Sequence, residues 1–244
     1  MNIGGGINIG PGVSILNDYI APVFVTTNAL LYLDAGQTAS YSGSGTTWTD
    51  LSTNTNNATF TGSPPFTSAG AASYFSFNGA GTQLATTPTG KYNTSYTGKT
   101  VFVAARMNAS FGSGLYRCLF GTPTGTRNFN TYIYSPSSGV YEIHGSFGSG
   151  AILSNPLTLT TGQWFTVGIT QDGSGNMIGY FNGQSVYSAT GQTLAQWVSN
   201  GGENVAYGDN YWYGDISVVA VYSRALSSAE MATNHAAIRN RYGI

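Results

Sequence analysis

Apolar and polar residues alternate over short distances along most of the chain. From Val23 onward, short runs rich in β-branched and aromatic residues are separated by clusters of Gly, Asn, Ser, Thr and Pro, a pattern typical of strands between turns. Because no helical segments separate these runs, the pattern predicts an all-β sandwich. Asp172–Gly173 and Asn182–Gly183 predict hairpin-type turns. The predicted strands cover residues 23–25, 30–33, 74–77, 100–105, 119–120, 131–134, 140–143, 164–169, 177–181 and 216–222.

The last part of the chain has a helical period instead. Ser227 and Glu230 form the Ser-x-x-Glu pattern of a capping box, in which each side chain satisfies a free backbone N–H. From Met231 to Ile238, residues that include Ala232, Ala236 and His235 recur at three- and four-residue steps, which predicts one docking stripe. We therefore expect a single C-terminal helix with a structural role.

The first fifteen residues follow a six-residue repeat of isoleucine and glycine. Apolar residues two apart share one face of an extended chain, and glycine permits sharp bends between units. A six-residue unit cannot bury that face alone, so it must dock on a surface or on sister chains. We expect residues 1–28 to form a docking arm and residues 29–244 one domain; a flexible leader is the alternative. The assembly residues of the arm are Ile3, Ile7, Ile9, Val13 and Ile15.

Charge is scarce in this sequence. Charged residues make up 7% of the chain and the formal net charge is −1, whereas about 25% is usual in soluble domains. A nucleic-acid binder needs clustered Lys and Arg, so no nucleic-acid partner is expected. No apolar run approaches the roughly 18 residues of a membrane span. Cys118 is the single cysteine, which excludes an internal disulfide and a cysteine-based metal cage.

Several short motifs are spread over residues 30 to 244. They are Leu31–Gly36, Gly45–Ser52, Asn56–Ala58, Phe77–Gly79, Gly162–Val167, Asp172–Gly173, Tyr180–Gly183 and, most specifically, Tyr222–Ser227. Together they resemble the concanavalin A-like jelly roll in its laminin-G-like or pentraxin-like branch. The resemblance implies a two-sheet antiparallel jelly-roll sandwich, to which the extended N-terminal arm and the C-terminal α-helix predicted above are attached. The strand pattern independently supports a sandwich, although not this topology.

The arm carries a second resemblance. Similar glycine and isoleucine repeats are fused to jelly rolls of this branch in structural proteins of marine tailed bacteriophages. This implies a non-enzymatic virion protein, either a capsid decoration or a tail or fibre component, assembled in the host cytoplasm and anchored to other virion proteins. A homo-oligomer is expected, and threefold symmetry would let three arms bury their isoleucines together. The alternative is a free carbohydrate-binding module of a lectin- or glucanase-like fold.

The carboxylates argue against a glycosidase, an activity that the resembled fold hosts. Retaining hydrolysis needs two carboxyl groups about 5 Å apart, and the glucanases of this fold place theirs in an acidic cluster on one strand. The glutamates Glu142, Glu203 and Glu230 have no acidic neighbour within four positions. His144 and His235 fall in neither a triad nor a zinc spacing. We expect no catalytic residues.

Metal ligands are equally sparse. Calcium takes about six to eight oxygen ligands, several of them carboxylates, and family members often carry an acidic residue at the position of Ser217. Asp215 would face the other side of its strand. Asp34, Asp50 and Asp172 lie in turn-like contexts, where an aspartate caps its own backbone. The residues support neither a Ca²⁺ site nor a cofactor, although the family resemblance leaves Ca²⁺ open.

One stretch combines aromatic and amide side chains, as a surface for host glycans requires. This stretch runs from Tyr207 to Tyr213. Trp164 lies outside it; because Trp164 alternates with Phe165 in a predicted strand, it is predicted to fill the core. Aromatic residues are also enriched at sheet edges and subunit contacts, so packing stays an alternative role. The candidate glycan-binding residues are Trp197, Tyr207, Asp209, Asn210, Tyr211 and Trp212.

Overall fold

The computed structural model describes residues 22–92, 97–122, 130–147, 150–153, 155–192, 202–207 and 211–244. The predictions for several residues lie outside these ranges and stay predictions. They are Ile3, Ile7, Ile9, Val13 and Ile15 of the arm, and Trp197, Asp209 and Asn210 of the candidate glycan site. No helix within the described ranges is long and apolar enough to cross a membrane.

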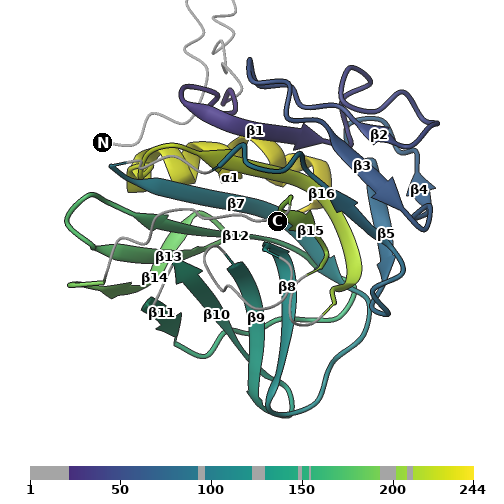
Figure 1. The fold of residues 1–244 in the computed structure, drawn as a ribbon. Coiled ribbons are helices and arrows are strands. Elements are labelled where there is room, and N and C mark those ends of the chain that lie inside the picture. The colour runs from purple at the N-terminus through teal and green to yellow at the C-terminus, as the bar shows by residue number, and fades with distance from the viewer. Residues whose placement is uncertain are drawn as a thin grey trace, which may run out of the picture.

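Two antiparallel sheets stack on each other, and one helix lies on the outer side of the first sheet (Figure 1). The helix-side sheet has the order β14 (Gln184–Ala189), β13 (Met177–Phe181), β12 (Trp164–Gln171), β7 (Lys99–Met107), β16 (Tyr213–Tyr222), β5 (Tyr74–Asn78) and β4 (Phe66–Thr67), with β1 (Ala29–Asp34) also paired to β16. The front sheet has the order β11 (Gly150–Leu153), β10 (Val140–Phe147), β9 (Asn130–Ser137), β8 (Leu115–Gly121), β15 (Asn204–Val205), β6 (Leu84–Thr86), β3 (Ala58–Thr61) and β2 (Thr47–Trp48). This arrangement confirms the predicted two-sheet sandwich with one C-terminal helix.

The main core lies between the sheets, and a second core lies under the helix. On β7, Val101 and Val103 point into the core between the sheets, while Phe102 and Ala104 point toward the helix. Both faces of this central strand are therefore buried, which explains why its sequence reads as a continuous apolar run rather than an alternating one.

The helix α1 (Ser228–Tyr242) begins at the predicted capping box. The Glu230 N–H donates to Ser227 Oγ at 3.3 Å, and the Ser227 N–H donates to Glu230 Oε2 at 2.8 Å. The predicted docking stripe is only partly right, because the buried residues of the helix are Met231, Asn234 and Ile238. A polar residue takes the middle position because Asn234 is satisfied there by hydrogen bonds.

Asn234 fixes the entry of the chain into the domain. Its Oδ1 accepts from the Val25 N–H at 2.8 Å, and its Nδ2 donates to the Tyr222 hydroxyl at 2.9 Å, which in turn donates to the Val25 carbonyl at 2.7 Å. Phe24 stacks on Tyr32 with ring centroids 4.6 Å apart. The predicted strand at residues 23–25 is wrong, because this segment bonds to side chains and pairs with no strand. The described end of the predicted arm, residues 22–28, is thus docked on the domain.

The other predicted strands all fall within observed ones. Asn182 and Gly183 form the expected tight turn between β13 and β14, with φ of 46° and 75°. The Asp172–Gly173 turn is longer than a two-residue hairpin, because the Asp172 N–H reaches the carbonyl of Asn176.

Candidate functional site

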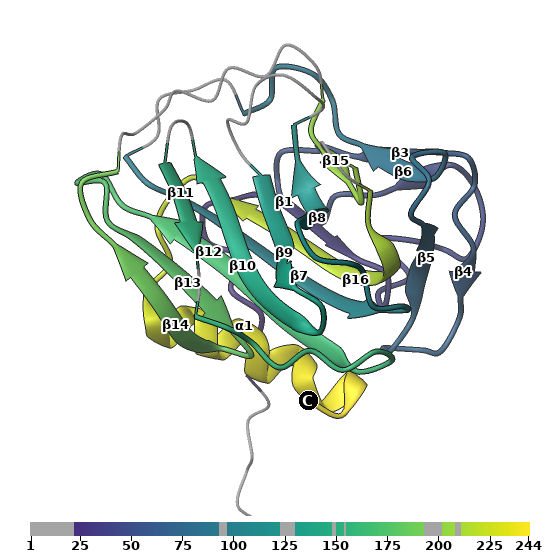
Figure 2. The same ribbon diagram turned by 90° about the horizontal axis from the view of Figure 1, so that it is seen from below.

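The two outer faces of the sandwich differ. Helix α1 packs on the outer face of the helix-side sheet and buries a second apolar cluster there. The front sheet has no helix on its outer face among the described residues, and Figure 2 shows its strands β8 to β11 in front of β7, β12 and β16. This face of the front sheet is therefore not covered by α1, which makes it the candidate surface for a ligand.

Strand register places aromatic and titratable side chains in two rows across this face. Ile133 and Ile143 point into the core, so their neighbours on β9 and β10 point outward. The first row pairs Tyr116, Tyr134 and Glu142 across β8, β9 and β10. The second row pairs Cys118, Tyr132 and His144 across the same strands. Directly paired residues lie on one face with Cβ atoms about 5 Å apart, so each row is contiguous.

The rings in these rows touch one another. Tyr116 stacks on Tyr134 with centroids 4.3 Å apart and an interplanar angle of 26°, and Tyr134 lies 4.6 Å from the His144 ring. Tyr116 and Tyr134 are half-buried, whereas Tyr132 and His144 are each 5% exposed. We call Tyr116, Tyr132, Tyr134, Glu142 and His144 the tyrosine face.

An imidazole–carboxylate pair forms one end of the tyrosine face. His144 Nε2 lies 3.1 Å from Glu142 Oε2. Burial lowers the pKa of His144, and the hydrogen bond and charge of Glu142 oppose that effect. The pair leaves the second oxygen of the half-buried Glu142 carboxylate without a hydrogen bond to a described residue, and this oxygen can accept a bond from a ligand hydroxyl.

Two of the predicted glycan-binding residues extend the second row. Tyr211 forms a bridge with Cys118 on β8, which places it on the same face. Its ring lies 5.1 Å from that of Tyr207, and both residues are half-buried. Gly81 has a φ of 71°, and a Cβ there would approach the Tyr211 ring to 2.2 Å. The absence of a side chain at position 81 is thus what admits the ring.

The prediction for Trp212 as an exposed platform is wrong. Its side chain is 0% exposed and lies in the core between the sheets, 6.2 Å from the Phe165 ring in an edge-on contact. The cause is the two-residue period of extended chain, which turns Trp212 inward when Tyr211 faces outward. The packing role that the sequence left open is the one that Trp212 has.

Trp164 was expected in the core, and it lies on the opposite side of its strand. Phe165 belongs to the core between the sheets. Trp164 packs outside it, with its ring centroid 4.2 Å from Tyr242 and 5.5 Å from Tyr74. The Arg106 guanidinium lies 5.2 Å from the Trp164 ring. With only 9% of the residue exposed, Trp164 does not offer a free ring face.

The aspartates have structural partners. Asp50 accepts from the backbone of Tyr32 at 2.8 Å, and Asp172 accepts from the backbone of Ser174 at 2.9 Å. Asp34 is fully buried and accepts hydrogen bonds from Arg241 Nη1 and from the Gly36 N–H of its own turn. Among the described residues, no group of three or more His, Cys, Asp and Glu could hold a metal ion. The expectation of no cofactor and no Ca²⁺ site therefore stays a prediction.

The three glutamates lie apart in the chain's architecture. Glu142 is on β10, Glu203 is buried next to β15, and Glu230 is in the first turn of α1. Arg224 is the largest cause that lowers the pKa of Glu230 to about 2. No two glutamates share a strand. The acidic cluster on one strand that the glucanases of this fold use is therefore not formed by the glutamates of this chain.

The fold of the chain is similar to those of several solved binding domains. The binding domain of Paraclostridial Mosquitocidal Protein 1 matches with a TM-score of 0.67 and 14% identity, over 86% of this chain and 52% of that one. Domain 4 of AbnA, a GH43 extracellular arabinanase from Geobacillus stearothermophilus, was solved in complex with arabinotriose. It matches with a TM-score of 0.63 and 16% identity, over 85% of this chain and 98% of that one. A structure of botulinum neurotoxin type C, a toxin whose cell entry depends on interaction with two ganglioside molecules, matches with a TM-score of 0.63 and 12% identity, over 88% of this chain and 52% of that one.

The chain spans about half the length of these toxin structures. At such identities the likeness shows the fold alone. No curated protein matches the chain in sequence. The sequence profile of the concanavalin A-like lectin/glucanases superfamily matches residues 78–232, and the chain belongs to this superfamily.

Proposed function

We propose that this protein is a non-enzymatic carbohydrate-binding protein that holds glycans on its tyrosine face. The observation that carries the proposal is the first row, in which stacked Tyr116 and Tyr134 lie beside the Glu142 carboxylate on an outer sheet face. Ligand sites of this kind combine aromatic surface with a few placed polar groups. The similar fold of an arabinanase domain solved with arabinotriose supports the same class of ligand.

The chemistry of the row suits a sugar. One face of a pyranose or furanose ring presents C–H groups, which can pack on a half-exposed tyrosine ring. Sugar hydroxyls can donate to the free Glu142 oxygen or exchange bonds with the tyrosine hydroxyls. Glu142 is held by His144 at 3.1 Å, whereas hydrolysis would need a second carboxyl group about 5 Å away. The row is therefore suited to binding rather than to bond cleavage.

A glycan array followed by calorimetry tests this function. Tyr116→Ala or Tyr134→Ala should weaken binding about tenfold, which is ~1.4 kcal/mol, because each removes a stacking ring. Tyr187→Ala is the matched control, since Tyr187 lies on β14 of the other sheet and is 37% exposed. Melting temperatures should show that all three variants fold. A wild-type protein that binds no glycan, or Tyr187→Ala losing as much affinity as Tyr134→Ala, would contradict the proposal.

The virion role is the second candidate, and the docked segment 22–28 favours it. Because Val25 is bonded to both α1 and β16, an arm formed by the preceding residues would leave the domain from a fixed point. We infer that such an arm anchors a capsid-decoration or tail-fibre protein, assembled in the host cytoplasm, to other virion proteins and to further copies of itself, with a trimer as one form. Deleting residues 1–16 should leave a domain that melts normally but no longer oligomerises in native mass spectrometry. Unchanged oligomers would refute the anchor.

A further inference from the structure

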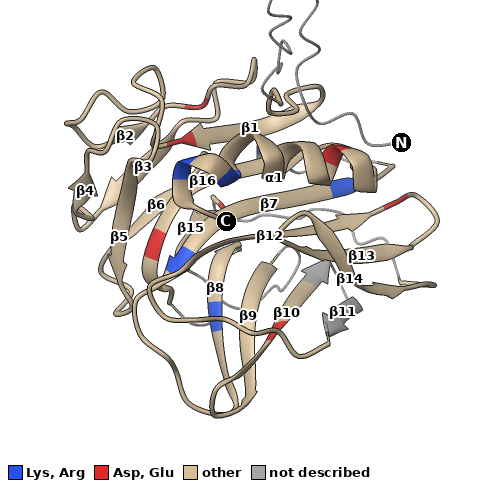
Figure 3. Cartoon of the chain, turned by 180° about the vertical axis from the view of Figure 1, so that it is seen from behind, with Lys and Arg blue, Asp and Glu red and all other residues tan. Residues whose placement is uncertain are grey.

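The tyrosine face carries a single acidic side chain, that of Glu142. In its strands β8, β9 and β10, the only other Lys, Arg, His, Asp or Glu residues are Arg117 and His144. Arg117 pairs with the core residue Ile133, so its side chain points to the other face of the front sheet. Figure 3 shows one basic segment on β8 and one acidic segment on β10. No Lys or Arg of these strands therefore lies on the same face as Glu142.

The pair formed by Glu142 and His144 keeps a net negative charge at neutral pH. His144 is 5% exposed, and burial lowers its pKa below the ordinary value of 6.5, although Glu142 opposes this effect. The imidazole is therefore neutral at neutral pH. Its Nε2 lies 3.1 Å from Glu142 Oε2, so it can donate a hydrogen bond to the carboxylate, but it supplies no positive charge.

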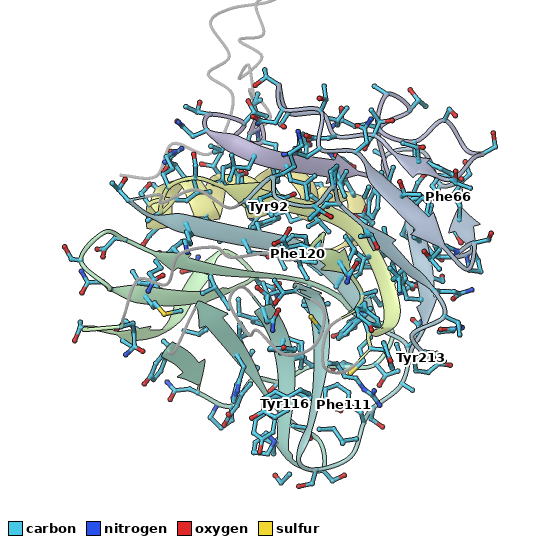
Figure 4. All side chains as sticks on the ribbon, in the orientation of Figure 1. Phe66, Tyr92, Phe111, Tyr116, Phe120 and Tyr213 are labelled. Carbon is cyan, nitrogen blue, oxygen red and sulfur yellow. The ribbon has the colours of Figure 1, made fainter. Side chains whose placement is uncertain are left out.

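The other oxygen of this carboxylate, Glu142 Oε1, is open to a ligand. It makes no hydrogen bond to a described residue, and 16% of the Glu142 side chain is exposed. Figure 4 places Tyr116, which stacks on Tyr134, on the side of the molecule away from α1. Glu142 pairs directly with Tyr134, and paired residues have Cβ atoms about 5 Å apart. A sugar ring packed on Tyr134 would therefore also cover Oε1.

The energetic cost of covering this oxygen depends on the ligand. A carboxylate that loses water without gaining an opposite charge is destabilised, because its hydration is only partly replaced. A sugar hydroxyl restores one hydrogen bond but leaves the negative charge uncompensated. An ammonium group does both, and such charge-assisted bonds are about twice as strong as neutral ones. A ligand carboxylate would instead bring two like charges together.

We propose that the tyrosine face selects glycans with an unacetylated amino sugar, such as glucosamine, whose ammonium group binds Glu142 Oε1. The sugar ring packs on Tyr134 and Tyr116, while His144 holds Oε2 and so positions the carboxylate. This inference rests on the proposed function and narrows it to cationic glycans; neutral glycans bind more weakly and acidic glycans are rejected.

Calorimetry with matched trisaccharides tests this preference in the full-length wild-type protein. Trimers of glucosamine, N-acetylglucosamine and glucose with the same linkage differ only at one ring carbon, which bears an ammonium, an acetamide or a hydroxyl. At a slightly acidic pH, which keeps the amine protonated, the glucosamine trimer should bind about tenfold more tightly than the other two. Its advantage should shrink as salt is added, because salt screens the attraction.

Two glutamate variants then assign the preference to Glu142. Glu142→Gln keeps the size of the side chain and an acceptor oxygen but removes the charge, so the three trimers should bind equally. Glu230→Gln is the matched control, because it removes the same charge from α1 and should keep the full preference. Melting temperatures should show that both variants fold. A preference that persists in Glu142→Gln, or that is lost in Glu230→Gln, would contradict the role of Glu142.

NMR of the wild type locates the ammonium without any variant. A positive charge beside Glu142 offsets the effect by which Glu142 raises the pKa of His144. This pKa should therefore be lower with bound glucosamine trimer than with bound glucose trimer. His235 on α1 is the internal control, and its pKa should not differ between the two complexes. The same His144 pKa in both complexes would place the ammonium elsewhere and overturn the inference.

Failure of the inference and failure of the proposed function give different results. If the glucosamine trimer binds no better than the glucose trimer, or if neither binds while other neutral glycans do, the inference fails and the proposed function stands. If the wild type binds no glycan of any kind, both fail.

Discussion

Asn234→Ala should weaken the junction of helix, sheet and entering chain. Asn234 is fully buried and makes two hydrogen bonds, to the Val25 N–H at 2.8 Å and to the Tyr222 hydroxyl at 2.9 Å. Two such bonds contribute about 1 kcal/mol each, and the N–H of half-buried Val25, left without its acceptor, costs about 1 kcal/mol more, the low end of the range for a buried donor. Alanine recovers about 0.5 kcal/mol through its higher helix propensity. The net loss in free energy of unfolding should be about 2.5 kcal/mol.

The chain length converts this loss into a melting shift. For 244 residues, an unfolding entropy of about 2.1 cal/mol/K per residue predicts a fall of about 5 °C in Tm. Asn240→Ala is the matched control, because it makes the same substitution at an exposed position of the same helix and should stabilise slightly. Hydrogen exchange at the Val25 amide should accelerate in Asn234→Ala alone. If the two variants melt at the same temperature, the junction does not carry the stability assigned to it.

Three further predictions concern titration and packing. The pKa of Glu230 is lowered to about 2, chiefly by Arg224, so the Glu230 carboxylate stabilises the fold fully above its ordinary pKa of 4.5. The free energy of unfolding should fall as the pH drops from 4.5 toward 2, and Glu230→Gln should flatten this part of an acid titration. Burial raises the pKa of Tyr242 to about 12, so the unfolded chain loses this proton first and stability should fall above about pH 10. Gly81→Ala should displace the Tyr211 ring and lower stability by about 1–3 kcal/mol, measured by urea unfolding.

Each of these has a result that would contradict it. Identical acid titrations of wild type and Glu230→Gln would show that the cap contributes nothing at low pH. A stability that is constant between pH 9 and about 12 would show that the Tyr242 environment does not favour its neutral form. Gly81→Ala with wild-type stability and an unshifted Tyr211 ring resonance would mean that the loop around position 81 yields freely.

The sequence predicted an element of secondary structure correctly where a pattern of nearby residues determined that element. The long apolar runs of β7, β12 and β16 are buried on both faces of the sheet. Their own residues are therefore enough to predict them as strands, without knowledge of the strands with which they pair. The capping box of α1 was equally readable, because Ser227 and Glu230 are only three residues apart. The short strands β2, β4 and β15 have two residues each and have no periodicity to detect. β15 also depends on partners far away in the sequence, β6 and β8, whereas β2 and β4 each pair with the next strand along the chain.

The candidate site depended on register, which the sequence does not display. Tyr132 and Tyr134 flank the buried Ile133, and this alternation was visible. Their meeting with His144 and Glu142 follows from the pairing of Ser137 with Val140 across the turn and from a bulge after Val140. The same limit explains Trp212. An alternating pair shows that Tyr211 and Trp212 face opposite ways, but only the bridge to Cys118 shows which one faces outward.

The bonding of Val25 to Asn234 and Tyr222 has a mechanical consequence. The entering chain is held by the last helix and by the last strand, so a pulling force applied at residue 22 and at Ile244 would load this junction. Most of the strands lie outside that path and would bear no tension. When the protein is pulled between its described ends, the helix should therefore detach from the sheet before the strands of the sandwich separate.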